Sequence, residues 1–462
     1  MSLVISISGI RGTIGGIPGE GLTPIDTVQF TSAYASWLKS RSGKDQPSVA
    51  LGRDARISGP MVEQLVTATL SAMGLNVFQL GLATTPTVEM AVTELGTDGG
   101  IILTASHNPA QWNALKLLNE RGEFLSAGDG KSILERVRTN DFTYADIKKL
   151  GTIKPIEGMD VKHIKQVLNL NLVNVKKIED KGFRVAIDCV NSVGGIILPG
   201  LLKELGVKEV VELYCEPTGE FPHNPEPLPE HLSEISKTVI REKADVGFVV
   251  DPDVDRLAIV CEDGSMFGEE YTLVAISDYI LSKTPGNTAS NLSSSRALRD
   301  VTEGYDQTYF PSAVGEVNVV ETMKQHQCVI GGEGNGGIIY PELHYGRDAL
   351  VGIALFLMHL AESGLPCSEL RKCYPDYFIS KNKITLSEDV DVDQVLATFE
   401  KEYADFEVIT VDGVKVDMPE GWVHLRKSNT EPIIRLYAEA GIREVAERLA
   451  QNAKDTINQM LK

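Results

Sequence analysis

The chain has 462 residues, a formal net charge of −20 at pH 7 and 42% hydrophobic residues. At roughly 150 residues per domain, this length corresponds to about three domains, each able to bury a core. The acidic balance argues against a nucleic-acid-binding protein and against a polybasic membrane anchor, so neither nucleic acid nor a membrane is an expected partner. A few arginines that converge on one pocket can still bind an anionic small molecule.

The chain carries no segment typical of secretion or of a membrane span. Its first residues, MSLVISISGIRG, lack the basic region of a signal peptide. The longest apolar stretch, 349–360, is shorter than the ~20 residues that cross a bilayer, and we predict a buried core helix there. The six cysteines form no CxxC pair and are typical of reduced thiols, so we expect a cytoplasmic protein.

Short apolar runs typical of strands alternate with longer helical patterns along most of the chain. Strands are predicted at 48–51, 76–79, 100–103, 183–187, 246–250 and 328–330. Helical patterns are predicted at 60–73 and from about residue 348. This alternation predicts α/β domains with mixed, mostly parallel sheets, in which ligands bind beyond the carboxyl ends of strands.

The C-terminal part has a different pattern, with charged helices among strands. Helices are predicted at 390–403 and 442–461, and strands at 406–411, 422–426 and 433–438. This pattern predicts a smaller α+β domain. We expect domain boundaries near 152, 256 and 370, which gives the ranges 1–152, 153–256, 257–370 and 371–462.

The segment TASHNPAQWNALK, 104–116, follows a predicted strand and contains Ser106, His107 and Lys116. A serine exposed at a strand end can act as a nucleophile when something activates it or supplies an electrophilic phosphorus. Lys116 could return to the same pocket as a proton-transfer group. Taken alone, however, the segment is also compatible with a polar turn that caps the next helix.

The segment VVDPDVDRLAIV, 249–260, places Asp251, Asp253 and Asp255 in one short loop. Neighbouring carboxylates repel one another unless a cation compensates them, and oxygen ligands indicate Mg²⁺ or Ca²⁺. An EF-hand is excluded because Arg256 occupies the position that requires glycine and because the flanks resemble strands. A solvated acidic turn is disfavoured by the apolar flanks.

Two further loops carry polar side chains suited to a sugar phosphate. In GGEGNGG, 331–337, glycines let the backbone approach a ligand, and Glu333 and Asn335 can bind hydroxyls. In RKSNTEPIIR, 426–435, guanidinium groups and hydroxyls suit a phosphate dianion; the candidates are Arg426, Ser428, Asn429, Thr430 and Arg435. A flexible loop and a surface turn are the respective structural alternatives.

Three other arginines lie near these loops in the sequence. Arg11, in SGIRG, could face an anionic pocket. For Arg53 and Arg56, in GRDAR, a salt bridge and a ligand contact are equally compatible with the sequence.

Together, SGIRG, TASHNP, DPDVDR, GGEGNGG and RKSNTEP resemble, in this order, the motifs of the α-D-phosphohexomutase superfamily. The resemblance covers nearly the whole chain. It implies three related α/β domains and a smaller, mobile α+β domain. It also implies reversible phosphoryl transfer between O6 and O1 of a hexose phosphate, through a phosphoserine enzyme and a hexose 1,6-bisphosphate intermediate.

The resemblance also implies a role for each candidate residue. Ser106 would carry the phosphoryl group, and Mg²⁺ would be held by Ser106 and the three aspartates. Lys116 would transfer protons, with Arg11 near the reacting phosphate and His107 in the same catalytic group. Glu333 and Asn335 would bind the sugar, while Arg256 and the 426–435 loop would bind phosphate.

Several positions depart from the family pattern. The sugar loop of the family is often GExSGH, whereas Asn335 and Gly337 stand here at the Ser and His positions, which leaves the second acid/base open. The GEGNGG and RKSNTEP forms favour glucosamine 6-phosphate as substrate, with glucose or mannose phosphates as the alternative. A phosphatase, a nucleotide-sugar transferase and a non-catalytic sugar-phosphate-binding protein are rivals of other classes. We expect a monomer or homodimer.

Overall fold

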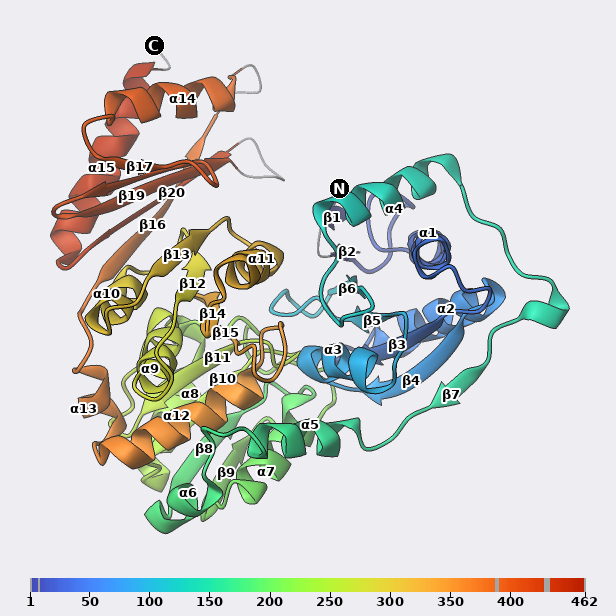
Figure 1. Ribbon diagram of the computed structural model, residues 1–462, viewed down its shortest axis with the longest axis horizontal. Helices are drawn as coiled ribbons and strands as arrows, with labels where there is room; N and C mark the ends of the chain where they lie inside the picture. Colours follow the sequence, from blue (N-terminus) through green and yellow to red (C-terminus); the bar gives the residue numbers. More distant parts are fainter. Residues whose placement is uncertain (1, 7–8, 387–389, 428–432, 461–462) are drawn as a thin grey trace. The chain divides into compact units, whose positions relative to one another are not determined.

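The computed structural model describes residues 2–6, 9–386, 390–427 and 433–460. These residues divide into two compact units, the first formed by 1–272 and 335–368 and the second by 273–334 and 369–462. Figure 1 labels the helices and strands along the chain.

The N-terminal part of the first unit consists of one β-sheet with α-helices packed against it. Its elements are β1 (Val4–Ser6), β2 (Gly9–Thr13), α1 (Pro24–Ser42), β3 (Ser48–Arg53), α2 (Gly59–Ala72), β4 (Asn76–Leu82), α3 (Thr85–Glu94), β5 (Gly99–Leu103), β6 (Trp112–Leu118), α4 (Ala127–Thr139), the 3₁₀ turn η1 (Ile147–Lys149) and β7 (Ile153–Pro155). The sheet order is β1-β2-β6-β5-β3-β4-β7. The strands β5, β3, β4 and β7 run parallel, whereas β1, β2 and β6 are antiparallel to their neighbours.

Successive residues of the central strands point to opposite faces of this sheet. Ile101 and Leu103 of β5 pack into the core formed with α1, α2 and α4. Gly100, between them, lies against Val92 of α3, where a side chain would have no room. The central strands are therefore buried on both faces, as expected for parallel strands covered by helices.

The rest of the first unit contains a second sheet. Its elements are α5 (Met159–Leu168), α6 (Val175–Lys181), β8 (Arg184–Asp188), α7 (Gly194–Glu204), β9 (Glu209–Leu213), η2 (Pro229–His231), α8 (Ser233–Glu242), β10 (Val246–Val250), β11 (Leu257–Cys261), β15 (Gly337–Ile339) and α12 (Ala349–Ser363). The order is β11-β10-β8-β9, and only β11 is antiparallel to its neighbour. This sheet continues past residue 256, where the sequence predicted a domain boundary.

The predicted buried helix near residue 349 is α12. Asp348 caps its N-terminus by accepting a hydrogen bond from the Leu350 N–H at 2.8 Å. Gly364 ends the helix in the left-handed conformation, φ 68°, that glycine adopts without strain. Nearly all its side chains are buried, which confirms the prediction of a core helix. Among the described residues, no helix is both long enough and apolar enough to cross a bilayer.

The second unit contains two further sheets. Its elements are α9 (Glu269–Leu281), which begins in the first unit, β12 (Thr288–Asn291), α10 (Ala297–Gly304), β13 (Tyr309–Ser312), α11 (Glu316–His326), β14 (Ile330–Glu333), α13 (Cys367–Arg371), β16 (Phe378–Thr385), α14 (Val392–Glu402), β17 (Glu407–Ile409), β18 (Val414–Met418), β19 (Gly421–Lys427), β20 (Ile433–Ala440) and α15 (Arg443–Met460). In one sheet β13, β12 and β14 are parallel.

The C-terminal sheet is antiparallel throughout, in the order β16-β20-β19-β18-β17. Figure 1 shows α15 lying along this sheet, and side chains of α14 and α15 pack with it into one core. Parallel-rich sheets with helices and a smaller antiparallel C-terminal domain confirm the predicted fold class.

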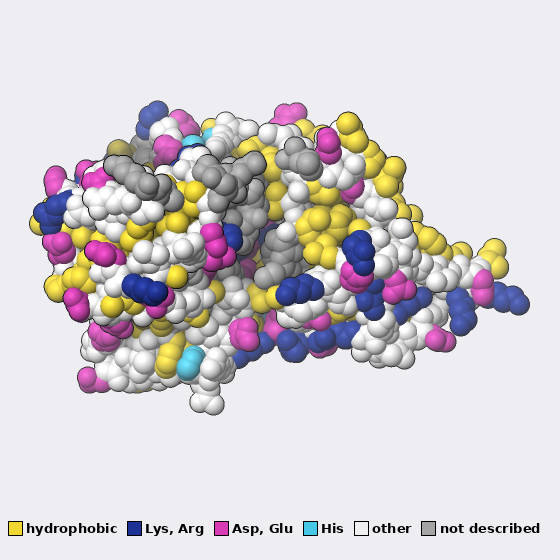
Figure 2. All heavy atoms as spheres, turned by 90° about the horizontal axis from the view of Figure 1, so that it is seen from above, with side chains coloured by type: hydrophobic (Ala, Val, Ile, Leu, Met, Phe, Trp, Pro, Cys, Tyr) yellow, Lys and Arg dark blue, Asp and Glu magenta, His cyan; other side chains and the backbone are white. Residues whose placement is uncertain are grey.

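Both signs of charge occur on the surface. On the face drawn in Figure 2, Lys and Arg side chains are interspersed with Asp and Glu side chains.

Candidate active site

Ser106 lies just beyond β5 in an unusual backbone conformation. Its φ is 48°, a left-handed value that serine rarely adopts. Its N–H donates to Thr104 Oγ1 at 2.9 Å, and the Thr104 hydroxyl donates to Asp54 Oδ2 at 2.7 Å. Backbone strain of this kind persists where surrounding contacts impose it, and it occurs often at functional sites.

Arg56 imposes much of this conformation. Its side chain is fully buried, and its Nε lies 3.0 Å from Asp54 Oδ2. Its two terminal nitrogens donate to the carbonyls of Pro109 at 2.8 Å and Trp112 at 3.0 Å, and also to those of Ser106 and Asn108. Of the two possibilities left open by the sequence, Arg56 therefore makes a salt bridge, and in addition it holds the 106–112 loop.

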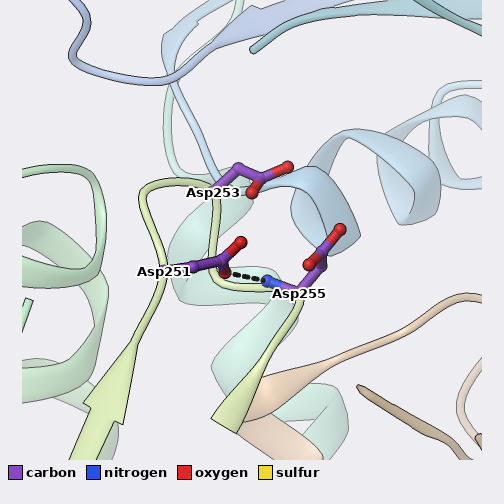
Figure 3. A group of neighbouring side chains, drawn as sticks. All are labelled: Asp251, Asp253 and Asp255. Carbon is purple, nitrogen blue, oxygen red and sulfur yellow. Dashed lines mark hydrogen bonds between the residues drawn. The ribbon is translucent and has the colours of Figure 1, made fainter. Parts of the chain in front are cut away.

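The three aspartates lie in the tight turn between β10 and β11. All are buried, and Figure 3 shows their side chains extending to the same side of the turn. The N–H groups of Asp255 and Arg256 each donate to Asp251 Oδ1 at 3.2 Å. Val254 inside the turn has a φ of 65°, which a β-branched residue adopts only when the surroundings force it.

The electrostatics of this turn fit a divalent cation. One oxygen of each aspartate lies within 4.8 Å of the others. Within the described residues, Asp253 Oδ1 and Asp255 Oδ1 are buried without a hydrogen-bond partner. Burial, and then the carboxylates of Asp255 and Asp253, raise the pKa of Asp251 well above its usual range. Buried oxygens that lack partners, in an all-carboxylate set, are suited to Mg²⁺.

Ser106 is joined directly to this cluster. Its Oγ donates to Asp251 Oδ2 at 2.6 Å and lies 3.4 Å from His107 Nδ1. Burial, and then the charges of nearby arginines led by Arg256, lower the pKa of His107 to about 2. The structure thus brings a hydroxyl nucleophile and a neutral imidazole to the edge of the carboxylate cluster.

Lys116 reaches the same cluster from β6. This strand runs antiparallel to β5, with Lys116 opposite Ile102, so the chain returns beside Ser106. Lys116 Nζ lies 2.7 Å from Asp253 Oδ2 and 3.1 Å from Asp255 Oδ2. Burial disfavours the charged amine, but the two carboxylates outweigh it and raise the pKa of Lys116 above its ordinary value.

Three arginines surround these groups. Arg347 Nη2 lies 2.7 Å from Asp255 Oδ2, a contact that the sequence did not predict. Arg256 lies farther from its carboxylate partners, at 3.9 Å from Asp255 Oδ1 and 3.8 Å from Glu226 Oε1. Arg11, on β2, donates to Asn108 Oδ1 of the serine loop at 3.4 Å. The site is therefore bordered by cations, as a phosphate site requires.

The remaining predicted residues belong to other parts of the structure. Glu333 ends β14 in the second unit, so it lies in a strand and not in the predicted loop; its Oε1 accepts from Asn291 at 2.9 Å and from the Gly315 N–H at 3.2 Å. Asn335 belongs to the first unit, where its Oδ1 accepts from the Gly337 N–H at 3.2 Å.

The predicted phosphate loop connects β19 and β20 of the second unit. Arg426 and Arg435 are directly opposite each other on these two strands. Arg426 Nε lies 3.3 Å from Asp412 Oδ2, whereas Arg435 is exposed. Ser428, Asn429 and Thr430 lie outside the described residues.

Family models match consecutive parts of the chain. They are described as phosphoglucomutase/phosphomannomutase alpha/beta/alpha domain I, domain II and domain III and the C-terminal domain, and they match residues 4–144, 161–264, 268–377 and 383–456. A probable phosphoglucosamine mutase of Methanopyrus kandleri is 32% identical over 99% of this chain and 98% of its own length. The chain belongs to the phosphoglucomutase/phosphomannomutase family.

Other relatives agree with this membership. A phosphoglucomutase/phosphomannomutase of Thermococcus kodakarensis is 33% identical, covering 98% of this chain and 99% of its own. A solved family protein from Burkholderia thailandensis has the same fold, with a TM-score of 0.84 and 24% identity over 99% of this chain and 98% of that chain. As a member of this family, the protein is a phosphomutase, an enzyme of the isomerase class. The buried aspartate cluster fits a metal-dependent enzyme.

Sequence reasoning missed several residues around this site. Arg347 was not singled out, because Asp255 lies 92 residues away in sequence. For Arg56 the salt bridge was one of two possibilities, but its contacts with the carbonyls of the 106–112 loop were missed, because that loop lies 50 or more residues away. Thr85 was also missed; its hydroxyl donates to Asp253 Oδ2 at 2.6 Å. The only sequence signal for Thr85 was its position at the start of a helical pattern. Polar residues are common at helix N-termini whatever their function, so this signal does not identify a site residue.

Proposed function

We propose that the protein is a phosphoglucosamine mutase, which interconverts glucosamine 6-phosphate and glucosamine 1-phosphate. The reaction would pass through phosphorylated Ser106 and a hexose 1,6-bisphosphate. The observation that carries the proposal is the 2.6 Å contact between Ser106 Oγ and Asp251. It lies inside a cluster whose other two carboxylates each present a buried oxygen that has no hydrogen-bond partner in the described part of the chain.

The aspartate cluster is the proposed Mg²⁺ site, with Asp251, Asp253, Asp255 and an oxygen of Ser106 as ligands. Bound Mg²⁺ would neutralise charge on the transferring phosphoryl group. Arg56 and Thr104 hold the loop of Ser106, so the nucleophile is oriented before substrate arrives.

The reaction needs a proton acceptor and donor at the sugar oxygen. We assign this role to Lys116, whose amine lies between Asp253 and Asp255 at the edge of the cluster. His107 and Arg11 belong to the same catalytic group. Arg256 is assigned to the phosphate that reacts.

The sugar and the second phosphate would be held by groups of the glycine-rich and C-terminal loops. Glu333 and Asn335 are assigned to sugar hydroxyls. Arg426 and Arg435 would anchor the phosphate that does not react, together with Ser428, Asn429 and Thr430. A fixed anchor suits a bisphosphate that must bind in two orientations.

A second candidate activity is phosphoglucomutase/phosphomannomutase. It is favoured by the 33% identical Thermococcus kodakarensis protein that bears this name, whereas the Methanopyrus kandleri protein favours glucosamine. The hexoses differ at C2, so the two candidate activities differ in the contacts made to the C2 substituent.

A coupled mutase assay with Mg²⁺ and trace 1,6-bisphosphate separates the candidates. We expect the highest kcat/KM with glucosamine 6-phosphate; equal or higher values with glucose or mannose phosphates would favour the second activity. We also propose a cytoplasmic monomer or homodimer without nucleic-acid or membrane partners, with domain boundaries near 152 and 370.

A further inference from the structure

Arg347 contacts a proposed metal ligand but has no part in the function proposed above. Its Nη2 lies 2.7 Å from Asp255 Oδ2, and only 10% of its side chain and none of the Asp255 side chain is exposed. A contact of this kind is a short, charge-assisted hydrogen bond sheltered from solvent.

The two oxygens of Asp255 have different surroundings. Oδ2 is held by Arg347 and, at 3.1 Å, by Lys116 Nζ. Oδ1 is buried and, within the described residues, accepts no hydrogen bond. Two cationic donors on one oxygen fix the rotation of the carboxylate, so the other oxygen is presented to a cation in one direction.

Arg347 is itself fixed by the backbone around it. Residue 347 forms a bridge with Ile339, the last residue of β15, and the following N–H, of Asp348, donates to the Ile338 carbonyl at 2.8 Å. The Asp348 carboxylate binds His163 Nε2 at 2.8 Å and caps α12. The guanidinium is therefore carried by a rigid segment.

Gly337, at the start of β15, provides the space for this arginine. A Cβ atom placed on Gly337 would overlap Arg347 Cδ and would come within 3.1 Å of Asn335 Oδ1. The backbone of Gly337 does not have a positive φ, so conformation does not require glycine there. What the position requires is the absence of a side chain.

We propose that Arg347 is a positioning residue of the metal site, which orients Asp255, and that Gly337 lacks a side chain so that Arg347 can reach this carboxylate. The inference rests on the proposed function, because it assumes that Asp255 is a metal ligand. It adds Arg347 and Gly337 to the residues that support the proposed function. Of these two, Gly337 departs from the family's sugar-loop pattern.

The test is a titration of the full-length protein, with Ser106 dephosphorylated and no sugar present, with Mn²⁺ followed by electron paramagnetic resonance. Charge alone predicts that Arg347→Met binds the cation more tightly, because a positive charge is removed. Positioning predicts weaker binding, by about 10- to 100-fold as for other residues that orient metal ligands. The two explanations therefore have opposite signs.

Two further variants keep the charge and test position alone. Arg347→Lys retains one positive charge but loses the planar fork, and Gly337→Ala changes no charge at all. We expect both to weaken Mn²⁺ binding at least about 10-fold. Gly128→Ala is the matched control, because Gly128 is exposed and a Cβ there would meet nothing closer than 3.8 Å; it should bind Mn²⁺ like the wild type.

The outcomes separate this inference from the proposed function. Wild-type affinity in both Gly337→Ala and Arg347→Lys, or tighter binding in Arg347→Met, would overturn the positioning role. Mn²⁺ binding by the wild type without turnover of any hexose phosphate would overturn the function and leave the positioning role to be judged by the variants. No Mn²⁺ binding by the wild type would overturn the metal site and this inference together.

Discussion

Arg56→Met is expected to destabilise the part of the first unit that carries Ser106. The substitution keeps a side chain of similar length but leaves the Asp54 carboxylate, which is fully buried, without its cation. Breaking one partner of a buried ion pair costs about 3–5 kcal/mol. The carbonyls of Pro109 and Trp112 also lose a donor, but the loop can open to water, so we expect a total of about 3–5 kcal/mol.

Equilibrium urea unfolding measures this effect. Trp37 and Trp112 lie in this part of the chain and report its unfolding by fluorescence. With a slope of about 2–3 kcal/mol per molar urea, the midpoint should fall by about 1–2.5 M.

Arg53→Met is the matched control, because Arg53 pairs at 2.8 Å with Glu63, which keeps a second donor in Gln79. Its cost should be smaller, about 1–3 kcal/mol, because Glu63 keeps the hydrogen bond from Gln79. A midpoint for Arg56→Met no lower than that of Arg53→Met would refute the reasoning. If Arg56→Met does not fold, Arg56→Lys, which keeps the charge, should show a smaller shift in the same direction.

Three other predictions follow from the site and its surroundings. Arg435→Ala should raise KM at least about tenfold with a smaller change in kcat, because a charged phosphate contact is worth about 1.5–3 kcal/mol; an unchanged KM would remove this arginine from the substrate site. Chelation of divalent cations should abolish turnover, and added Mg²⁺ should restore it; full activity after chelation would contradict the metal assignment. Burial lowers the pKa of His424 to about 4, so the folded state binds fewer protons than the unfolded state between pH 6.5 and 4. Stability should therefore be complete above pH 6.5 and fall as pH falls through this window, and urea unfolding of His424→Gln should show a weaker pH dependence; equal slopes would contradict it.

Local patterns in the sequence predicted much of the fold. Strand β10 coincides with the predicted 246–250, and α2, β5 and α12 differ from their predictions by a few residues at most. These elements are buried and periodic, so the hydrophobic pattern determines both their type and their position. The strand β6 was not predicted, because its residues mix polar and apolar side chains in a segment that had suggested a turn.

The sequence predicted where strands lie better than it predicted which strands pair with each other in a sheet. The boundary expected at 256 falls between β10 and β11, which pair as antiparallel neighbours in one sheet. The turn between them is short and contains the three aspartates, so the sequence shows a loop there but not that the chain folds back on itself. Pairing depends on contacts that a linear pattern does not contain.

Residues of the site were predictable when they were clustered in sequence. Asp251, Asp253 and Asp255 stand close together in one short turn, and their carboxylates gather there. Arg347, in contrast, lies 92 residues from Asp255, and Lys116 lies 137 residues from Asp253. Lys116 was selected because it follows Ser106 in the same short segment, whereas Arg347 belongs to no segment that carried a candidate residue and became visible only in the folded chain.

The most direct test of the account is the phosphorylation of Ser106. The full-length protein is incubated with Mg²⁺ and a hexose 1,6-bisphosphate, and its peptides are then analysed by mass spectrometry. The account predicts one phosphoryl group on Ser106, which exchanges during turnover, so that an isotope label placed on phosphorylated Ser106 passes to the hexose phosphates when glucosamine 6-phosphate is added; it predicts no phosphoryl group in Ser106→Ala. Phosphorylation at another residue, or a Ser106→Ala variant that retains mutase turnover, would contradict it.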